Sequence, residues 1–419
     1  MKNTNSNFRP LLYDLLQGLG IALLFSYFIY AEHFDLTFEL INSITALAAF
    51  YLFLKAPTRV ILSAGFFIGL LWFYWIGYSF KYYHVGWMAP FITLFFALLY
   101  TLFFGVLALT KNPLVRALIL FAISFVEPMD WNWLQAELPF VNTYFGIDKW
   151  QYALILAALS LFLYFSAHKE MRKFRYGALL LLVGALNFTT PEYIKPDLKI
   201  KLYAPELLQE EKWLPQNRQT IVAENLKVIQ QAIKEKYDLV VLPESAFPLF
   251  LNSAPQIESL LRDYSRQIDI ITGALYIENK LHYNVSYHFS KGRVQIAKKL
   301  VLVPFGEYIP LPSFLRQWVN TTFFDGASDF VTAKEPSDSI IKGVKFRSAV
   351  CYEATCEEIY EGDPDYLIAI SNNGWFHPSI EPTLQKLLMR FYAKKHHTII
   401  FHSANMGGSG IIRGNGELQ

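Results

Sequence analysis

The feature that most constrains this chain is a series of apolar runs that fills its first half. The runs cover residues 11–30, 36–54, 60–80, 88–109, 114–126, 151–167 and 176–188. A helix needs about 20 apolar residues to cross the hydrocarbon core of a bilayer, and most of these runs approach that length. The fifth and seventh runs are shorter. We therefore predict a polytopic α-helical membrane domain with about seven spans in residues 1–190.

The basic residues between the runs predict the orientation of this domain. They collect in alternate segments, at Lys2 and Arg9, Lys55 and Arg59, Lys111 and Arg116, and Lys169, Arg172, Lys173 and Arg175, whereas the intervening loops hold only Lys81 and Lys149. The positive-inside rule then places the N terminus in the cytoplasm, and seven crossings place everything after residue 188 outside. The first run lacks a small-residue cleavage site, so we interpret it as an anchor and not as a signal peptide.

Aromatic residues gather near the expected outer ends of the spans. One group lies late in the third run, at Trp72, Tyr74, Trp75, Tyr78, Tyr82 and Tyr83, and another lies in the loop 127–149, at Trp131, Trp133 and Phe140. An aromatic belt at the membrane–water interface is one interpretation. The other is a surface on which lipids approach an external domain.

Composition narrows the function classes. Hydrophobic residues make up 53% of the chain and charged residues 17%, and the net charge is +2. No basic stripe with interleaved aromatic residues is present, so we expect no nucleic-acid partner. Two cysteines, Cys351 and Cys356, are too few for a disulfide framework, although a bridge between them stays open in an oxidising compartment. We predict no metal site and no cofactor.

The pattern changes after Pro191 and Pro196 to one in which strands alternate with helices. Strands are predicted at 199–203, 238–242, 268–275, 283–290, 293–303, 344–350 and 366–371, and helices at 217–236, 255–267 and 384–395. Alternating strands and helices indicate a layered α/β domain, here residues 191–419. Such folds place their chemistry at strand ends.

Three reactive side chains lie at or near these strands. Glu244 follows Val240–Pro243, Lys299 lies in the segment 298–307, and Cys351 follows Ser348–Val350. A thiol at a strand-to-helix turn lies near the positive end of a helix, which favours thiolate. The carboxylate would act as general base and then acid, and the ammonium would stabilise thiolate and oxyanion. Each also has a structural interpretation: a helix cap, a surface charge and a buried core cysteine.

The motifs around these residues resemble the apolipoprotein N-acyltransferase family. They are Pro243-Glu244-Ser245-Ala246, Lys299 ahead of Leu302-Val303-Pro304-Phe305-Gly306-Glu307-Tyr308, and Cys351-Tyr352-Glu353. The resemblance implies a nitrilase-like αββα sandwich that follows a polytopic membrane domain and lies outside the inner membrane. The family usually ends with further strands and a final span, and this sequence stops at Gln419, so we expect the domain to lack them.

The resemblance also implies roles for individual residues. Glu244 would be the general base, Lys299 the oxyanion and thiolate stabiliser, and Cys351 the nucleophile. Glu307 would be a second essential carboxylate that orients Lys299 or the attacking amine. Substrate-binding roles would fall to Trp213, Phe247, Tyr352, Glu353 and Trp375. The two tryptophans would lie on mobile loops that touch substrate, with ordinary packing as the alternative. Phe247 begins an apolar run, 247–250, that we expect to be exposed and to contact an acyl chain.

The activity implied is transfer of a fatty acyl chain from a phospholipid, through a thioester on Cys351, to the α-amino group of the S-diacylglyceryl-cysteine of an apolipoprotein. A thioester conserves the energy of the ester, so an external domain needs no ATP. The bilayer would be a further partner, and the site would face the periplasm from a bacterial inner membrane. Two other functions stay open: a membrane-tethered amidase or nitrilase, and an inactive lipid-binding protein.

Overall fold

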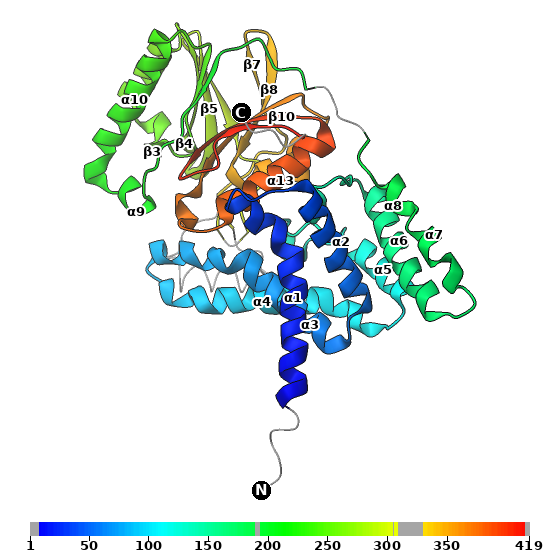
Figure 1. Cartoon of the computed structure of the whole chain (residues 1–419). Helices are drawn as coiled ribbons and strands as arrows, with labels where there is room; N and C mark the ends of the chain where they lie inside the picture. Colours follow the sequence, from blue (N-terminus) through cyan, green and yellow to red (C-terminus); the bar gives the residue numbers. More distant parts are fainter. Residues whose placement is uncertain (1–7, 189–192, 305, 309–329, 415–419) are drawn as a thin grey trace. The chain divides into compact units, whose positions relative to one another are not determined.

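The chain forms two compact units, residues 1–190 and residues 191–419. The computed structural model describes residues 8–188, 193–304, 306–308 and 330–414. The first unit is helical and the second is built from strands and helices (Figure 1).

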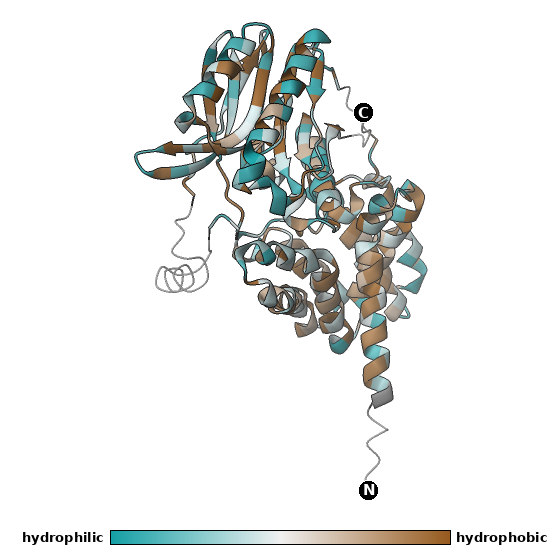
Figure 2. Cartoon of the chain, turned by 90° about the vertical axis from the view of Figure 1, so that its left-hand side faces the viewer, coloured by the Kyte–Doolittle hydropathy of each residue, from teal (hydrophilic) through white to brown (hydrophobic). Residues whose placement is uncertain are grey.

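The helices of the first unit follow the apolar runs. They are α1 (Phe8–His33), α2 (Glu39–Lys55), α3 (Thr58–Phe73), α4 (Ala89–Gly105), α5 (Pro113–Ile123), α6 (Lys149–Ala167), α7 (Arg175–Ala178) and α8 (Leu181–Gly184). The 3₁₀ segment η1 (Tyr74–Tyr83) extends α3, and η2 (Gly86–Met88) and η3 (Val106–Leu109) flank α4. Hydrophobic residues run along these helices (Figure 2).

The predicted count of seven spans is not confirmed. Within the described residues, four helical stretches are long and apolar enough to cross a membrane: Pro10–His33, Thr58–Tyr83, Gly86–Leu109 and Lys149–Ala167. The runs 36–54 and 114–126 form the shorter helices α2 and α5, and the run 176–188 is divided between α7 and α8. Apolar length alone does not separate a residue that faces lipid from one that packs on another helix, so the count of about seven spans stays a prediction.

Several of the aromatic residues expected at an interface are instead buried in the first unit. Trp72 is fully buried, with Phe25 and Phe28 rings both 5.6 Å away. Trp131 and Trp133 are buried 5.5 Å apart, so the prediction that their loop lies on the outer surface is wrong. These indoles fill the interior of the helical unit.

Arg116 also differs from its expected place among the loop charges. Its side chain is buried, and its guanidinium donates to the carbonyl oxygens of Leu54 and Ala56 at 3.0 and 2.7 Å. Those carbonyls lie at the end of α2, where a helix leaves its last C=O groups without internal partners. Arg116 therefore caps a helix, and it does not act as a free loop charge.

The second unit contains two sheets. The first has the order β1-β2-β4-β5-β6 with β3 paired to β4, and the second has the order β11-β10-β9-β8-β7. Their strands are β1 (Ile200–Leu202), β2 (Leu239–Val241), β3 (Phe247–Phe250), β4 (Asp269–Glu278), β5 (Leu281–Ser290), β6 (Arg293–Lys298), β7 (Asp338–Ile341), β8 (Val344–Val350), β9 (Tyr366–Asn372), β10 (Ile399–Asn405) and β11 (Gly410–Ile412). The helices are α9 (Gln209–Lys212), α10 (Arg218–Lys234), α11 (Pro255–Tyr264) and α13 (Glu381–His396).

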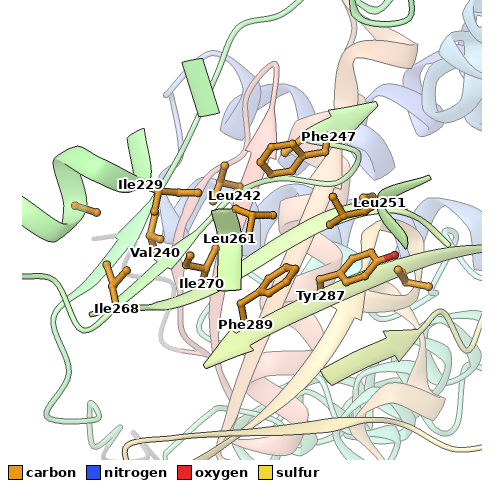
Figure 3. Close-up of a cluster of buried hydrophobic side chains, with 14 of the residues drawn as sticks. Ile229, Val240, Leu242, Phe247, Leu251, Leu261, Ile268, Ile270, Tyr287 and Phe289 are labelled. Carbon is orange, nitrogen blue, oxygen red and sulfur yellow. The ribbon is translucent and has the colours of Figure 1, made fainter. Parts of the chain in front are cut away.

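Two apolar cores hold these layers together. The cluster between the sheets combines β2 residues such as Val241 with β8 and β9 residues such as Val350 and Ile370. The cluster on the outer face of the first sheet joins Ile229 of α10 and Leu261 of α11 to the strands, as Figure 3 shows. A sheet hydrophobic on both faces needs a cover on each, so the unit is an αββα sandwich, as the sequence predicts.

Parallel pairing brings several strand ends to one edge. β1, β2 and β4 are mutually parallel in the first sheet, and β8, β9 and β10 are parallel in the second.

The β5–β6 hairpin turns at Lys291 and Gly292, both with positive φ, as a two-residue hairpin turn requires.

One apolar segment is buried where we expect exposure. The prediction of an exposed run after Glu244 is wrong for Phe247, whose side chain is fully buried in the core cluster (Figure 3). The segment forms β3, which pairs with β4. Phe247 therefore stabilises the protein's own core, and its contact with an acyl chain stays a prediction.

Candidate active site

Glu244 lies just beyond β2, at a sharp turn of the backbone. Ser245, the next residue, has a φ of 49°, which side-chain-bearing residues rarely adopt. The turn is packed against β4, because a Cβ atom on Gly273 would lie only 2.6 Å from the Cα atom of Glu244. Glycine at 273 thus lets the backbone that carries Glu244 approach β4 closely.

Lys299 follows β6 and lies against a second carboxylate. Its Nζ atom lies 2.6 Å from Oε2 of Glu307, and its side chain is 1% exposed. The backbone N–H of Val303 also donates to Glu307 Oε2, at 2.9 Å. The carboxylate of Glu307 therefore contacts Lys299, as the resemblance implies for one of its two expected roles.

Asn284 on β5 connects this ion pair to Glu244. Its Nδ2 atom donates to Glu244 Oε1 at 2.6 Å and to Glu307 Oε1 at 3.0 Å. One amide group thereby orients both carboxylates. Sequence reasoning missed Asn284, because an asparagine inside a strand carries no local signal of its partners.

Cys351 lies directly beyond β8 with a φ of 57°. A non-glycine residue held in this region is strained, and such residues collect at functional sites. The chain then forms η9 (Cys351–Thr355), a five-residue 3₁₀ helix and not the longer helix that the sequence suggests. The strained turn directs the cysteine toward the strand ends.

Glu353 fixes this turn to the segment that carries Lys299. Its Oε1 atom accepts a hydrogen bond from the N–H of Val350 at 2.5 Å, and its Oε2 atom accepts from Leu300 and Val301 at 2.6 and 3.3 Å. Glu353 is buried, so these bonds are shielded from water. The nucleophile and the lysine therefore lie on two segments held together by one carboxylate. Tyr352 is buried beside it.

The charges around Cys351 do not favour a resting thiolate. Burial raises the pKa of its thiol well above the ordinary range, the carboxylate of Glu244 raises it further, and Lys299 lowers it by less. Lys299 lowers the pKa of the thiol in the predicted direction, but burial and Glu244 outweigh it in the free site. The thiol needs a base, and Glu244 is the carboxylate with the largest effect on it.

Lys299 stays protonated in spite of its burial. Burial alone lowers the pKa of its ammonium group, but Glu307, Cys351, Glu244 and Glu353 together raise it above the ordinary value. A buried cation held by a carboxylate is suited to stabilise an oxyanion, because its charge is little screened by water.

Lys212 is a second buried ammonium group that sequence reasoning missed. It ends α9, is 2% exposed, and donates from Nζ to the backbone carbonyl of Glu244 at 3.0 Å. Burial lowers its pKa to about 8, although Glu244 and Cys351 act in the opposite direction. It lies in the charged run 209–212, which gives no sign of burial.

The segment before Trp213 is tied to the ends of β9 and β10. Gln209 accepts a hydrogen bond from Asn372 at 2.8 Å, and Asn372 in turn accepts one from Asn405 at 2.8 Å. Trp213 itself is 38% exposed at the end of α9. Trp375 is half-buried in η11 (Asn373–Phe376).

Two further polar side chains on α13 lie near the nucleophile. Gln385 places its Nε2 atom 3.9 Å from Cys351 Sγ. Glu381, one turn earlier, carries a carboxyl whose pKa is raised well above its ordinary range by burial and by Glu244. Neither residue was singled out from the sequence.

Comparison with known proteins agrees with this architecture. Residues 12–188 match the apolipoprotein N-acyltransferase integral membrane domain, and residues 211–417 match the carbon-nitrogen hydrolase family. An apolipoprotein N-acyltransferase of Wolinella succinogenes is 42% identical over 411 residues, which cover 97% of each chain. The chain belongs to the apolipoprotein N-acyltransferase family.

A second relative and a solved structure extend the comparison. The apolipoprotein N-acyltransferase of Helicobacter pylori is 36% identical, over 93% of this chain and 91% of the relative. Among solved structures, a CN-hydrolase superfamily protein of Xanthomonas campestris is 18% identical, over 54% of this chain and 86% of that chain, with a TM-score of 0.39. The first unit of this family member is thus a membrane domain, and the second is a carbon-nitrogen hydrolase domain.

Proposed function

We propose that this chain transfers a fatty acyl group from a phospholipid to the α-amino group of the N-terminal S-diacylglyceryl-cysteine of apolipoproteins, through a thioester on Cys351. The observation that carries this proposal is the assembly of Glu244, Lys299 and Cys351 by two connectors. Asn284 orients Glu244, and Glu353 joins the cysteine turn to the lysine segment. The names of the relatives support the acceptor class.

In the first half-reaction Glu244 removes the proton from Cys351 Sγ, and the sulfur attacks the ester carbonyl carbon of the phospholipid. A C–S bond forms and the π electrons of the carbonyl move to its oxygen, where Lys299 stabilises the negative charge. Collapse of this intermediate breaks the C–O bond. Glu244 returns its proton to the departing alkoxide, and lysophospholipid leaves.

In the second half-reaction the acceptor amine attacks the thioester carbonyl carbon. A C–N bond forms, the oxyanion again lies beside Lys299, and Glu244 takes a proton from the nitrogen. Collapse breaks the C–S bond, and that proton goes to the sulfur of Cys351. The amide product leaves with the enzyme restored, and no cofactor takes part.

The transfer assay uses labelled phospholipid and a diacylated lipopeptide, with the full chain in detergent or vesicles. Cys351→Ala removes the nucleophile and is expected to abolish label transfer. Cys356→Ala is the matched control, because Cys356 is the second cysteine of the chain and is buried, with its Sγ atom donating to the carbonyl of Tyr352 at 3.4 Å. It should keep activity within about threefold. Transfer by the Cys351→Ala variant would overturn the proposal, and label released only as free fatty acid would favour an amidase-like hydrolase.

The proposed location is a bacterial inner membrane, with the N terminus in the cytoplasm and the second unit in the periplasm. The basic segments support this orientation, since Arg172, Lys173 and Arg175 lie on the side expected to face the cytoplasm. An outside location also suits chemistry that needs no ATP. The number of crossings is part of the proposal.

Cysteine labelling tests the orientation. In a background without Cys351 and Cys356, an impermeant maleimide applied to spheroplasts should label Lys334→Cys of the second unit and should spare Arg172→Cys; both positions are exposed. The reverse pattern would place the catalytic unit in the cytoplasm.

A further inference from the structure

Two buried oxygen atoms on α13 lack hydrogen-bond partners. They are Oε2 of Glu381 and Oε1 of Gln385, and the residues are 1% and 0% exposed. Leaving a buried acceptor unpaired costs about 1–3 kcal/mol, so each such atom calls for an explanation. Residues four apart lie on the same face of a helix, so Glu381 and Gln385 are neighbours on one face of α13, and we treat their two oxygens as a pair.

This pair lies at the nucleophile. The amide of Gln385 reaches Cys351 Sγ with its Nε2 atom at 3.9 Å, and α13 packs on η9, which begins at Cys351. Glu381 is near enough to raise the pKa of the Cys351 thiol, and Glu244 raises the pKa of Glu381. The part of α13 that carries both residues therefore lies beside the cysteine sulfur, where an acyl group on that sulfur would react.

A ligand for two acceptors must offer two donors. The ester carbonyl of a phospholipid has none, and the carbonyl of the thioester has none either. A neutral primary amine has two N–H donors and one lone pair, which is the arrangement that an attacking amine needs. The acceptor substrate thus matches the pair, and the acyl donor does not.

We propose that Glu381 and Gln385 bind the α-amino group of the acceptor substrate. Their two oxygens accept hydrogen bonds from its two N–H groups, which leaves the lone pair of the nitrogen directed at the thioester carbonyl carbon. This inference rests on the proposed function. It assigns the second half-reaction to a site on α13, separate from the Glu244 and Lys299 groups that serve both halves.

The electrostatics of α13 agree with binding of an uncharged amine. Burial and then the charge of Glu244 raise the pKa of the Glu381 carboxyl well above its ordinary range, which favours a protonated carboxyl with a carbonyl oxygen as its acceptor. An α-amino group has an ordinary pKa of about 7.7–8.0, so its neutral form is abundant near neutral pH. After attack, one of the two N–H groups turns from Gln385 to Glu244, which takes the proton and passes it to the sulfur of Cys351, and Glu381 does not change its charge.

The test separates the two half-reactions. Acyl-enzyme is formed with phospholipid, freed of excess lipid, and mixed with a diacylated lipopeptide amine, while intact mass follows the loss of the acyl group. Glu381→Met removes the hydrogen-bond acceptor of residue 381 and keeps a side chain of similar volume. Gln385→Met does the same at residue 385. Glu381→Gln keeps a neutral oxygen acceptor and is the matched control.

We expect the ratio of amine discharge to acylation to fall about fivefold to tenfold in Glu381→Met and in Gln385→Met, as loss of one hydrogen bond predicts. Glu381→Gln should keep that ratio within about twofold. Formation of acyl-enzyme shows that each variant is folded.

An equal fall in acylation and discharge would overturn the inference, because it would indicate a structural role for α13. Unchanged discharge in both methionine variants, or a Glu381→Gln variant as slow as Glu381→Met, would overturn it too. Failure of the proposed function is a different result: the wild-type protein would then form no acyl-enzyme at all.

Discussion

Lys299 and Glu307 form a buried ion pair, with Nζ and Oε2 2.6 Å apart. Because Lys299 is almost inaccessible to water, this one carboxylate contributes most to keeping its ammonium group charged. In the proposed mechanism this pair supplies the positive charge that stabilises the carbonyl oxygen of each acyl intermediate. We propose that Glu307 holds Lys299 in place and keeps it charged.

Glu307→Gln should lower the rate of acyl-enzyme formation by about 100-fold, since breaking a buried pair costs about 3 kcal/mol. Burial lowers the pKa of Lys299 and Glu307 raises it, so the pKa of Lys299 should be lower in the variant. The alkaline fall in activity should therefore occur at a lower pH in the variant than in the wild type. The measurement is the pH profile of acylation by intact mass. Glu335→Gln, at an exposed position, is the control. An unshifted alkaline limb would contradict this role.

Glu353→Gln should loosen the turn that carries Cys351. The carboxylate accepts three backbone N–H bonds, whereas a glutamine offers one oxygen and turns a donor toward at least one N–H group. We expect a loss of about 1–3 kcal/mol in the stability of this turn. Hydrogen exchange at Val350, Leu300 and Val301 measures it, with exposed Glu358→Gln as the control. Wild-type protection at these amides would refute the connection.

Lys212→Met should stabilise the second unit below pH 8. The pKa of Lys212 is about 8 when folded and about 10.4 when unfolded, so the unfolded chain binds the extra proton between these values. Stability of the wild type therefore rises with pH across that window. Below pH 8 the buried ammonium group of Lys212 lowers the stability of the wild type by about 3 kcal/mol. The Lys212→Met variant regains this amount, but it loses about 1 kcal/mol with the hydrogen bond to the carbonyl of Glu244.

Hydrogen exchange of β2 and β4 as a function of pH measures this effect, with exposed Lys227→Met as the control. The advantage of the Lys212→Met variant should disappear as pH rises from about 8 to about 10.4. An advantage that is the same at all pH values would show that packing, and not charge, is responsible.

Gly273→Ala should displace the general base. The new Cβ atom would meet the Cα atom of Glu244 and the backbone N of Ser245, both at 2.6 Å, so the backbone must move. A displacement of about 1 Å costs about 100-fold in rate. Gly20→Ala has no atom within 4 Å of the new Cβ and should be silent. Single-turnover acylation compares them, and equal rates would contradict the account.

The catalytic strands were predictable because their signals are local. Strand 344–350 agrees with β8 at both ends, since an apolar alternation and a following turn define it. Strand 293–303 was predicted too long: β6 ends at Lys298. The N–H groups of Leu300, Val301 and Val303 donate to Glu353 and Glu307, so this apolar run bonds to side chains and not to a neighbouring strand.

The residue placements that could not be predicted from the sequence are those that depend on packing between distant segments. Burial of Lys212 and Glu381 is decided by the layers that cover them, and neither has an apolar neighbour pattern that reveals it. Phe247 was misplaced for the same reason, because its run pairs as β3 beside β4. In the first unit, apolar residues serve lipid contact and helix packing alike, so hydropathy alone does not determine the number of spans.

The central claim is the thioester on Cys351, and intact mass tests it most directly. Purified full-length protein is incubated with phospholipid and without acceptor. We expect an added fatty acyl mass on Cys351 that hydroxylamine removes and a lipopeptide amine discharges. No added mass in folded, reduced protein, or an adduct that persists in Cys351→Ala, would contradict the account.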